Sequence, residues 1–115
     1  MKEAGSPFMN GVPELLVLSC LKGREMYGYE LVQEIRDRTH TVVTLGEGVV
    51  YPLLHALEQK GALQSRRKSV QGRSRVYYAI TPKGLERLMG LSNTWSTLAT
   101  AIQQVMQGEA HAGAV

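Results

Sequence analysis

The sequence contains a single cysteine, Cys20, which excludes a disulfide framework and a cysteine-based metal cluster. Cys20 lies inside the apolar run of residues 15–21, so a buried structural thiol is expected there. No apolar stretch approaches the roughly 20 residues of a membrane span, and residues 1–10 lack the apolar core of a signal peptide. These absences predict a cytoplasmic protein.

Motifs that support catalysis are also missing. There is no glycine-rich phosphate loop, no nucleophile elbow and no pattern of a catalytic triad. The histidines His40, His55 and His111 do not have the close spacing of metal ligands, and no carboxylate cluster accompanies them. We therefore expect neither an enzyme nor a cofactor or metal site.

The cations are concentrated in one short segment. Lys and Arg number 13 against 10 acidic residues, and five of the cations lie within residues 66–75, which contain no acidic residue. A cluster of one sign is typical of a surface that binds phosphate groups. With 115 residues the chain can form a single core, so any further core has to come from a second chain.

Apolar periodicity predicts three helices in the first half of the chain. Residues 13–22 are almost wholly apolar and predict a buried helix that ends at Gly23. Residues 26–38 predict an amphipathic helix, because apolar residues recur every four positions. A third helix should be capped near Gly48, which puts Pro52 in its first turn, and should end at Gly61. Its core-facing residues are Val50, Leu53, Leu54 and Leu57.

The second half predicts a hairpin and a long helix. Residues 63–67 and 75–80 are strand-like, and the polar segment between them contains Gly72. Thr81 followed by Pro82 is a strong helix start, and this helix should run to about Gln107. No charged residue occurs between Arg87 and Glu109, so a second subunit is expected to cover much of it. Spacings of three and four define an apolar seam for another helix, formed by Leu88, Leu91, Trp95, Leu98, Ile102 and Val105.

This order of elements predicts a mostly α protein with a small β-hairpin, which is a winged helix-turn-helix with an added C-terminal dimerisation helix. The expected divisions are an N-terminal arm over residues 1–11, the winged helix-turn-helix over 12–81, the dimerisation helix over 82–107 and a flexible tail over 108–115. The segment Gly5-Ser6-Pro7-Phe8, before a second methionine, fits either a cloning remnant or a natural arm.

Two segments are predicted to contact DNA: the polar start of the third helix and the basic hairpin. The start of the third helix should meet base edges in the major groove, through Thr44, Gly46, Glu47, Gly48 and Tyr51. The hairpin should hold phosphates through Lys68, Gln71, Gly72, Arg73 and Arg75. For Tyr51 a phosphate contact is expected, and the alternative is packing against the hairpin.

The chain resembles the PadR family of bacterial transcriptional regulators between about residues 14 and 98. The similarity rests on the motifs Tyr27-Gly28-Tyr29-Glu30, Gly46-Glu47-Gly48-Val49-Val50-Tyr51-Pro52-Leu53-Leu54 and Gly72-Arg73-Ser74-Arg75-Val76-Tyr77-Tyr78. The single C-terminal helix resembles the short PadR subgroup. This resemblance implies a homodimeric repressor that binds an inverted-repeat operator in double-stranded DNA and controls efflux, detoxification or stress genes.

Some members of that subgroup hold flat aromatic compounds at the dimer centre, which implies a small aromatic effector. Trp95 lies in the middle of the seam, and Leu15, Phe8 and Met9 are the other candidates for such an effector site. Plain packing in the dimer core explains Trp95 and Leu15 equally well. The alternative function is a winged-helix adaptor that binds an acidic protein without reading DNA.

Overall fold

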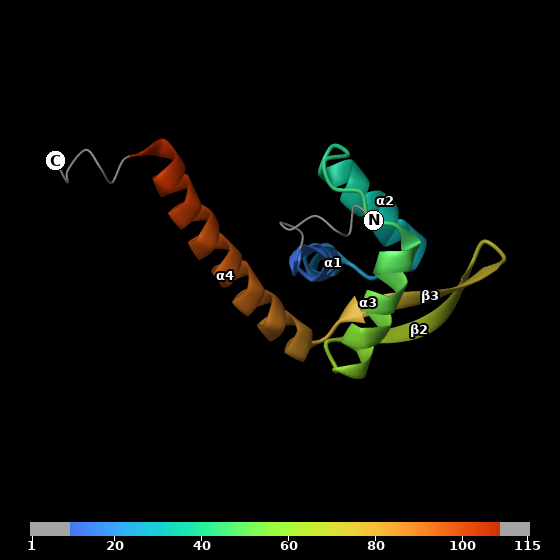
Figure 1. Cartoon of the computed structure of the whole chain (residues 1–115). Coiled ribbons are helices and arrows are strands. Elements are labelled where there is room, and N and C mark those ends of the chain that lie inside the picture. The colour runs from blue at the N-terminus through green and yellow to red at the C-terminus, as the bar shows by residue number, and fades with distance from the viewer. Residues whose placement is uncertain (1–9, 109–115) are drawn as a thin grey trace.

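The computed structural model describes residues 10–108, which form four helices and a small antiparallel sheet of three strands. The elements follow in the order α1 (Val12–Gly23), β1 (Met26–Tyr27), α2 (Gly28–Arg38), α3 (Glu47–Gln59), β2 (Leu63–Val70), β3 (Arg73–Ile80) and α4 (Pro82–Gln107). Figure 1 shows α1, α2 and α3 packed together, with the β2–β3 hairpin on one side and α4 extending away on the other. The fold is the predicted winged helix-turn-helix.

The hydrophobic core lies where the three packed helices meet the sheet. Each of these elements buries the apolar side that its periodicity predicts, and the fully buried side chains include Leu18, Leu31, Ile35, Val50, Leu54, Leu57 and Leu63. Cys20 is 6% exposed, which confirms the expected buried thiol, and burial raises its pKa above the ordinary value. Burial of these side chains gives α3 a fixed position beside the sheet.

The second helix begins at Gly28, so the prediction of a start near Met26 was wrong. Met26 and Tyr27 instead form β1 and pair with Tyr78 and Tyr77 of β3. β3 therefore lies in the middle of the sheet, in the order β1-β3-β2. Pairing with a strand about 50 residues later is a tertiary contact that overrides the local helical pattern.

The third helix begins at Glu47, and its N-cap is Gly46. Pro52 consequently lies in the helix interior and not in the first turn, which corrects the prediction. The proline removes the amide that would bind the carbonyl of Gly48. Both Gly48 and Pro52 are exposed, so water can bind that carbonyl and the helix continues.

The hairpin is longer and its turn tighter than predicted. The strands extend to Val70 and Arg73, which are the last paired residues before the turn. Gln71 and Gly72 form the turn with φ angles of 53° and 79°, the left-handed conformation that a two-residue turn between twisted strands requires. The whole hairpin, residues 63–80, is called the wing below.

The predicted helix start at Thr81 is confirmed, and the Thr81 side chain also bonds α4 to the turn that follows α3. The Thr81 hydroxyl oxygen accepts a hydrogen bond from the Gly84 amide at 3.0 Å, and the hydroxyl donates to the Gly61 carbonyl at 2.6 Å. A Cβ atom on Gly84 would lie 2.1 Å from the Ala62 carbonyl oxygen, so only glycine permits this approach. No helix within residues 10–108 combines the length and apolar character that crossing a bilayer requires.

We predict that Gly84→Ala lowers the free energy of unfolding by about 2 kcal/mol, because the added methyl group meets backbone that cannot move aside cheaply. Urea denaturation at fixed protein concentration measures this loss. Gly90→Ala is the matched control, since Gly90 lies in the same helix and has no atom within 4 Å of the position that a Cβ would take. The control should gain up to about 1 kcal/mol from helix propensity. Equal effects at both positions would contradict the prediction.

Candidate nucleic-acid interface

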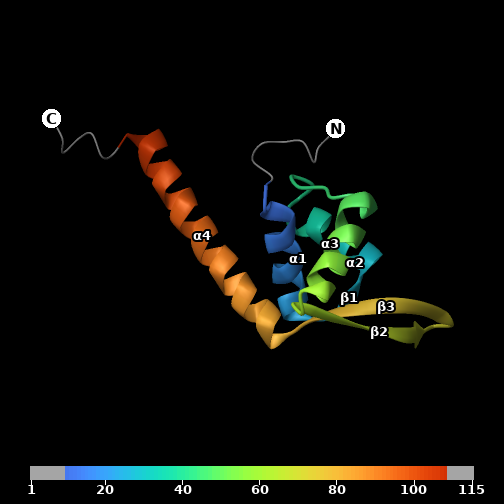
Figure 2. The same cartoon turned by 60° about the horizontal axis from the view of Figure 1, so that its bottom comes forward.

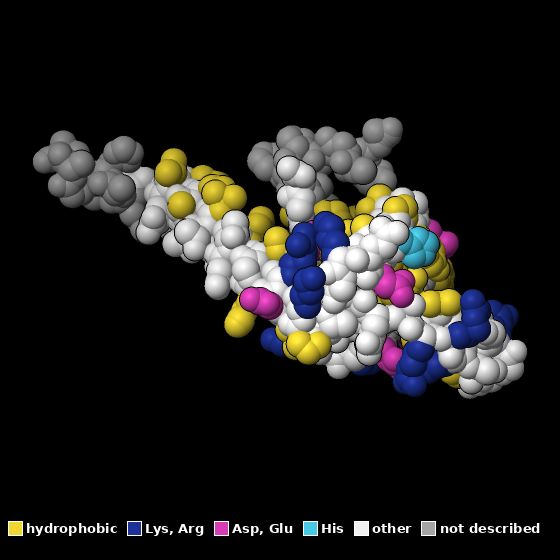
Figure 3. Space-filling view, turned by 90° about the horizontal axis from the view of Figure 1, so that it is seen from below, with side chains coloured by type: hydrophobic (Ala, Val, Ile, Leu, Met, Phe, Trp, Pro, Cys, Tyr) yellow, Lys and Arg dark blue, Asp and Glu magenta, His cyan; other side chains and the backbone are white. Residues whose placement is uncertain are grey.

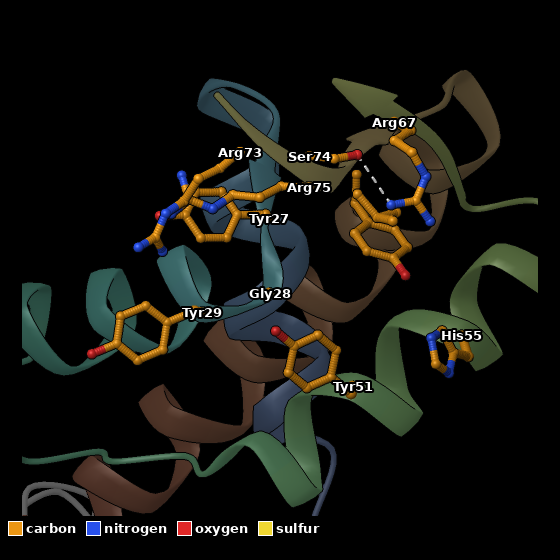
Figure 4. Close-up of a pocket in the computed structure, with 11 residues that line it drawn as sticks. Tyr27, Gly28, Tyr29, Tyr51, His55, Arg67, Arg73, Ser74 and Arg75 are labelled. Atoms are coloured by element: carbon orange, nitrogen blue, oxygen red, sulfur yellow. Dashed lines mark hydrogen bonds between the residues drawn. The ribbon is translucent and has the colours of Figure 1, made fainter. Parts of the chain in front are cut away.

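A pocket of about 460 Å³ lies between the wing, the start of α2 and the outer side of α3. We call it the wing pocket. Tyrosine and arginine side chains dominate its lining, as Figure 4 shows, and the lining residues are Tyr27, Gly28, Tyr29, Tyr51, His55, Arg67, Arg73, Ser74, Arg75, Val76 and Tyr78. The structure thus brings three predicted DNA contacts, Tyr51, Arg73 and Arg75, to one concave surface.

The start of α3 is open to a ligand. Thr44, Glu47 and Gly48 are exposed, and Gly46 has no atom within 4 Å of the position that a Cβ would take. Leu45 lies between them and is only 3% exposed, so it anchors this end of the helix to the core. The exposed surface therefore carries small or polar groups on a backbone that the core holds in place.

Tyr51 packs against α2, whereas the sequence left a choice between a phosphate contact and packing on the wing. A Cβ atom on Gly28 would lie 2.3 Å from Tyr51 Cε1, so the ring covers the first residue of α2. The side chain is half-buried and lines the wing pocket with His55, one helical turn further along α3. In Figure 4 the Tyr51 ring lies between Gly28 and the α3 backbone.

The wing cations divide into two groups. Arg66 and Lys68 both bind the Glu25 carboxylate: Arg66 Nη2 lies 2.9 Å and Lys68 Nζ lies 2.6 Å from Glu25 Oε2. These hydrogen bonds lower the pKa of Glu25 to about 2. Lys68, a predicted phosphate contact, is thus held by a carboxylate of its own chain.

The second group comprises Arg67, Arg73 and Arg75, which line the wing pocket. Arg67 donates a hydrogen bond to the Ser74 hydroxyl at 3.3 Å, and the Arg75 guanidinium lies over the Tyr27 ring, 4.4 Å from its centroid. Within residues 10–108, none of these three arginines has a carboxylate within 4.0 Å. Their charges are available to an anion from outside the chain. Gln71 and Gly72 form the exposed turn beyond them.

The sequence reasoning missed several residues of this surface. Tyr27 and Tyr29 flank Gly28 in a motif that supports the family resemblance. The motif did not indicate that both side chains line the wing pocket. Arg67 lies opposite Val76 in the ladder, and strand alternation places it on the same face as Ser74, the diagonal neighbour that accepts its hydrogen bond. Glu25 had no local signal, because its partners lie 41 and 43 residues further along the chain.

A second, apolar cavity of about 330 Å³ lies between the start of α1 and the middle of α4. Two of the predicted effector residues, Leu15 and Trp95, line it together with the seam residues Leu91, Leu98 and Ile102. The other two, Phe8 and Met9, lie outside the described residues. Of the remaining seam residues, Leu88 is buried against the core and Val105 is 76% exposed.

Comparison with known proteins identifies the family. Residues 17–89 match the transcriptional regulator PadR-like family. A Mycobacterium tuberculosis protein named as a transcriptional regulator is 32% identical over 104 residues, which cover 90% of this chain and 92% of that protein. Identity of this extent over nearly the whole chain indicates common ancestry and not only a shared fold.

Solved structures agree with this match. A PadR-like transcriptional regulator from Bacillus cereus is 33% identical and superposes with a TM-score of 0.78, over 89% of this chain and 98% of that one. A transcriptional regulator from Clostridium thermocellum is 27% identical, with a TM-score of 0.79 over 86% of this chain and 97% of that one. The family consists of transcriptional regulators and not of enzymes. The chain belongs to the PadR-like family of transcriptional regulators.

Proposed function

We propose that this regulator binds operator DNA sequence-specifically as a homodimer and acts as a repressor. The observation that carries the proposal is the wing pocket, whose lining combines Tyr51 and His55 of α3 with three arginines that have no carboxylate partner among the described residues. A DNA strand lying across this surface would place its phosphates against the wing while α3 enters the major groove.

The start of α3 suits contact with base edges. Glu47 is exposed in the first turn, and a carboxylate in the groove can accept a hydrogen bond from the amino group of cytosine. Gly46 and Gly48 beside it let the backbone approach the bases closely. The same carboxylate would repel phosphates, so Glu47 favours the middle of the groove over its edges.

The wing supplies the part of the affinity that does not depend on sequence. Arg67, Arg73 and Arg75 can each neutralise a phosphate and release counterions, and this contribution weakens steeply as salt is raised. Tyr29 and Ser74 add hydroxyl groups at the same surface, which can donate to phosphate oxygens.

We predict that the double substitution Arg73→Glu and Arg75→Glu lowers operator affinity at least about 100-fold and reduces the slope of log K against log salt by about two. Fluorescence anisotropy over a salt series, with duplexes selected from a random pool, measures both quantities. The matched control is the double variant Lys60→Glu and Lys83→Glu, which makes the same charge change at the α3–α4 junction. Unchanged DNA affinity in the wing variant would favour the adaptor function instead.

The homodimer is proposed from the apolar side of α4. Trp95, Leu98 and Ile102 are each about half exposed in the single chain. These apolar side chains lie in a row on the part of α4 that follows Arg87, which contains no charged residue, and such a surface is typical of one that another chain covers. Figure 3 shows hydrophobic side chains along the projecting α4, far from the Lys and Arg side chains of the wing.

The geometry also suggests where the second α4 would pack. α4 is about 39 Å long from its 26 residues, and Figure 2 shows it diverging from α1 as it leaves the sheet. Leu15 of α1 and Trp95 of α4 line the two sides of the resulting apolar cavity. An α4 helix from a second copy would pack along the open side of this cavity and enclose it, and the same contact would be made reciprocally around a two-fold axis.

We predict that Ile102→Glu converts the protein into a monomer, because an unpaired carboxylate would be buried in the seam. Sedimentation velocity over a concentration series measures the dimer dissociation constant, which should rise at least about 100-fold. Thr100→Glu introduces the same charge on the opposite side of α4 and should leave the dimer intact. A wild-type protein that is monomeric at every concentration would refute the dimer.

We further propose that a flat aromatic compound bound beside Trp95 regulates DNA binding. The cavity of about 330 Å³ offers an apolar lining with an indole at its edge. Such a ligand shifts operator affinity only as far as it prefers one dimer geometry over another, so binding and release from DNA are separate tests. Efflux, detoxification or stress genes are the proposed targets.

Trp95 is the only tryptophan of the chain, so its emission reports on this cavity alone. We predict saturable quenching of the dimer by members of a panel of flat aromatic amines and phenols. N-acetyltryptophanamide, titrated in parallel, corrects for collisional quenching. If no compound quenches beyond this control, Trp95 is part of the dimer core only.

A further inference from the structure

Glu25 is the one carboxylate among residues 10–108 that pairs with wing cations. It lies in the connection between α1 and β1, and its side chain is 23% exposed. Arg66 donates to both of its oxygens, at 3.2 and 2.9 Å, and Lys68 donates to one of them at 2.6 Å. We call these three residues the Glu25 clamp. The clamp joins the middle of β2 to a segment that the core holds in place.

Aromatic rings connect the clamp to Arg75, a wing-pocket arginine that lies opposite Lys68 in the ladder. Lys68 Nζ lies 4.2 Å from the centroid of the Tyr77 ring, and Tyr77 meets Tyr27 edge to face at 5.4 Å between centroids. The Arg75 guanidinium lies over the other part of this stack, 4.4 Å from the centre of the Tyr27 ring. Cation–π and edge-to-face contacts favour one relative placement of these groups. The position of Arg75 therefore depends on the clamp through a continuous chain of contacts.

Backbone pairing alone holds the wing only at its base. β1 contributes two residues, Met26 and Tyr27, opposite Tyr78 and Tyr77. Residues 69–74, nearer the turn, are all exposed. A two-stranded ribbon that protrudes from a core bends and twists readily. The clamp is placed between the held base and the free end, where it can restrict that motion.

We propose that Glu25 is a positioning residue that determines sequence specificity by fixing the angle of the wing relative to α3. It also withdraws Arg66 and Lys68 from DNA and leaves Arg67, Arg73 and Arg75 as the phosphate-binding cations. The proposal rests on the DNA-binding function proposed above. A wing at the correct angle sets the register in which α3 meets the bases. A wing that moves freely would bind the phosphates of any duplex equally well.

Two accounts of Glu25 predict different ratios of operator to random-duplex affinity for Glu25→Gln. If the carboxylate acts only through its charge, its removal strengthens binding to operator and random duplex in parallel. If it positions the wing, the freed cations strengthen binding to random duplex while the operator loses its advantage. The ratio of the two affinities therefore separates the accounts, whereas a change in either affinity alone does not.

The experiment measures operator and random-duplex affinities of the full chain over a salt series, for wild type, Glu25→Gln, Glu25→Asp and Glu86→Gln. Glu86 is exposed on α4, so Glu86→Gln is the matched control with the same change in charge. For Glu25→Gln we expect the affinity ratio to fall about tenfold and the salt slope for random duplex to steepen by about one. Glu25→Asp, which keeps the charge, should restore part of the ratio. An unchanged ratio in Glu25→Gln would overturn the proposal.

Amide hydrogen exchange of the free protein tests the clamp without DNA. In Glu25→Gln the amides of residues 66–75 should exchange faster, whereas those of α1 and α3 should match wild type, which shows that the variant is folded. Wing exchange equal to that of wild type and Glu86→Gln would refute the clamp. If wild type binds no duplex at low salt, the proposed function fails and the role in specificity fails with it, and the exchange data still decide whether Glu25 holds the wing.

Discussion

The close approach of α4 to the turn after α3 is the constraint on which the rest of the molecule depends. Gly84 meets the Ala62 carbonyl without a side chain between them, and Thr81 ties its own hydroxyl to the Gly61 carbonyl. A second tie joins α1 to α4 through the ion pair of Glu14 and Arg87. Because both ties lie within the first two turns of α4, the direction in which this helix projects is set by the winged helix-turn-helix. The separation of two wings in the proposed dimer follows from that direction.

The wing cations divide between ion pairs within the protein and a surface that is left for a ligand, although Lys68 and Arg75 lie opposite one another in the ladder. Glu25 takes up Arg66 and Lys68, and the lowered pKa of its carboxyl, about 2, keeps this pairing ionised into the acidic range. Arg73 and Arg75 lie on the neighbouring strand, opposite Val70 and Lys68, and have no carboxylate within 4.0 Å among residues 10–108. A count of basic residues would treat all of these as equal. The structure distinguishes the cations that pair with Glu25 from those that line the wing pocket.

Local patterns predicted the helices and the hairpin because the forces behind them act over a few residues. The Thr81-Pro82 start of α4 depends on a hydroxyl and a preset backbone angle, and both act within one turn. The buried sides of α2 and α3 follow from apolar residues that recur every three or four positions. The prediction for the start of α2 failed because a distant segment intervened: β1 pairs with β3 and replaces the expected first turn. The strands of the wing were also longer than predicted, through local pairing up to a two-residue turn.

The sequence by itself determined the fold class, the basic wing and the uncharged apolar seam, since these depend on residue type and spacing. Only the tertiary structure decided which cations remain available, that Tyr51 covers Gly28, and that Leu15 and Trp95 share one cavity. Each of these contacts joins residues that are at least 23 positions apart in the chain. Such contacts exist only once the core has brought the elements together, because no short-range pattern records the partner that a side chain will meet.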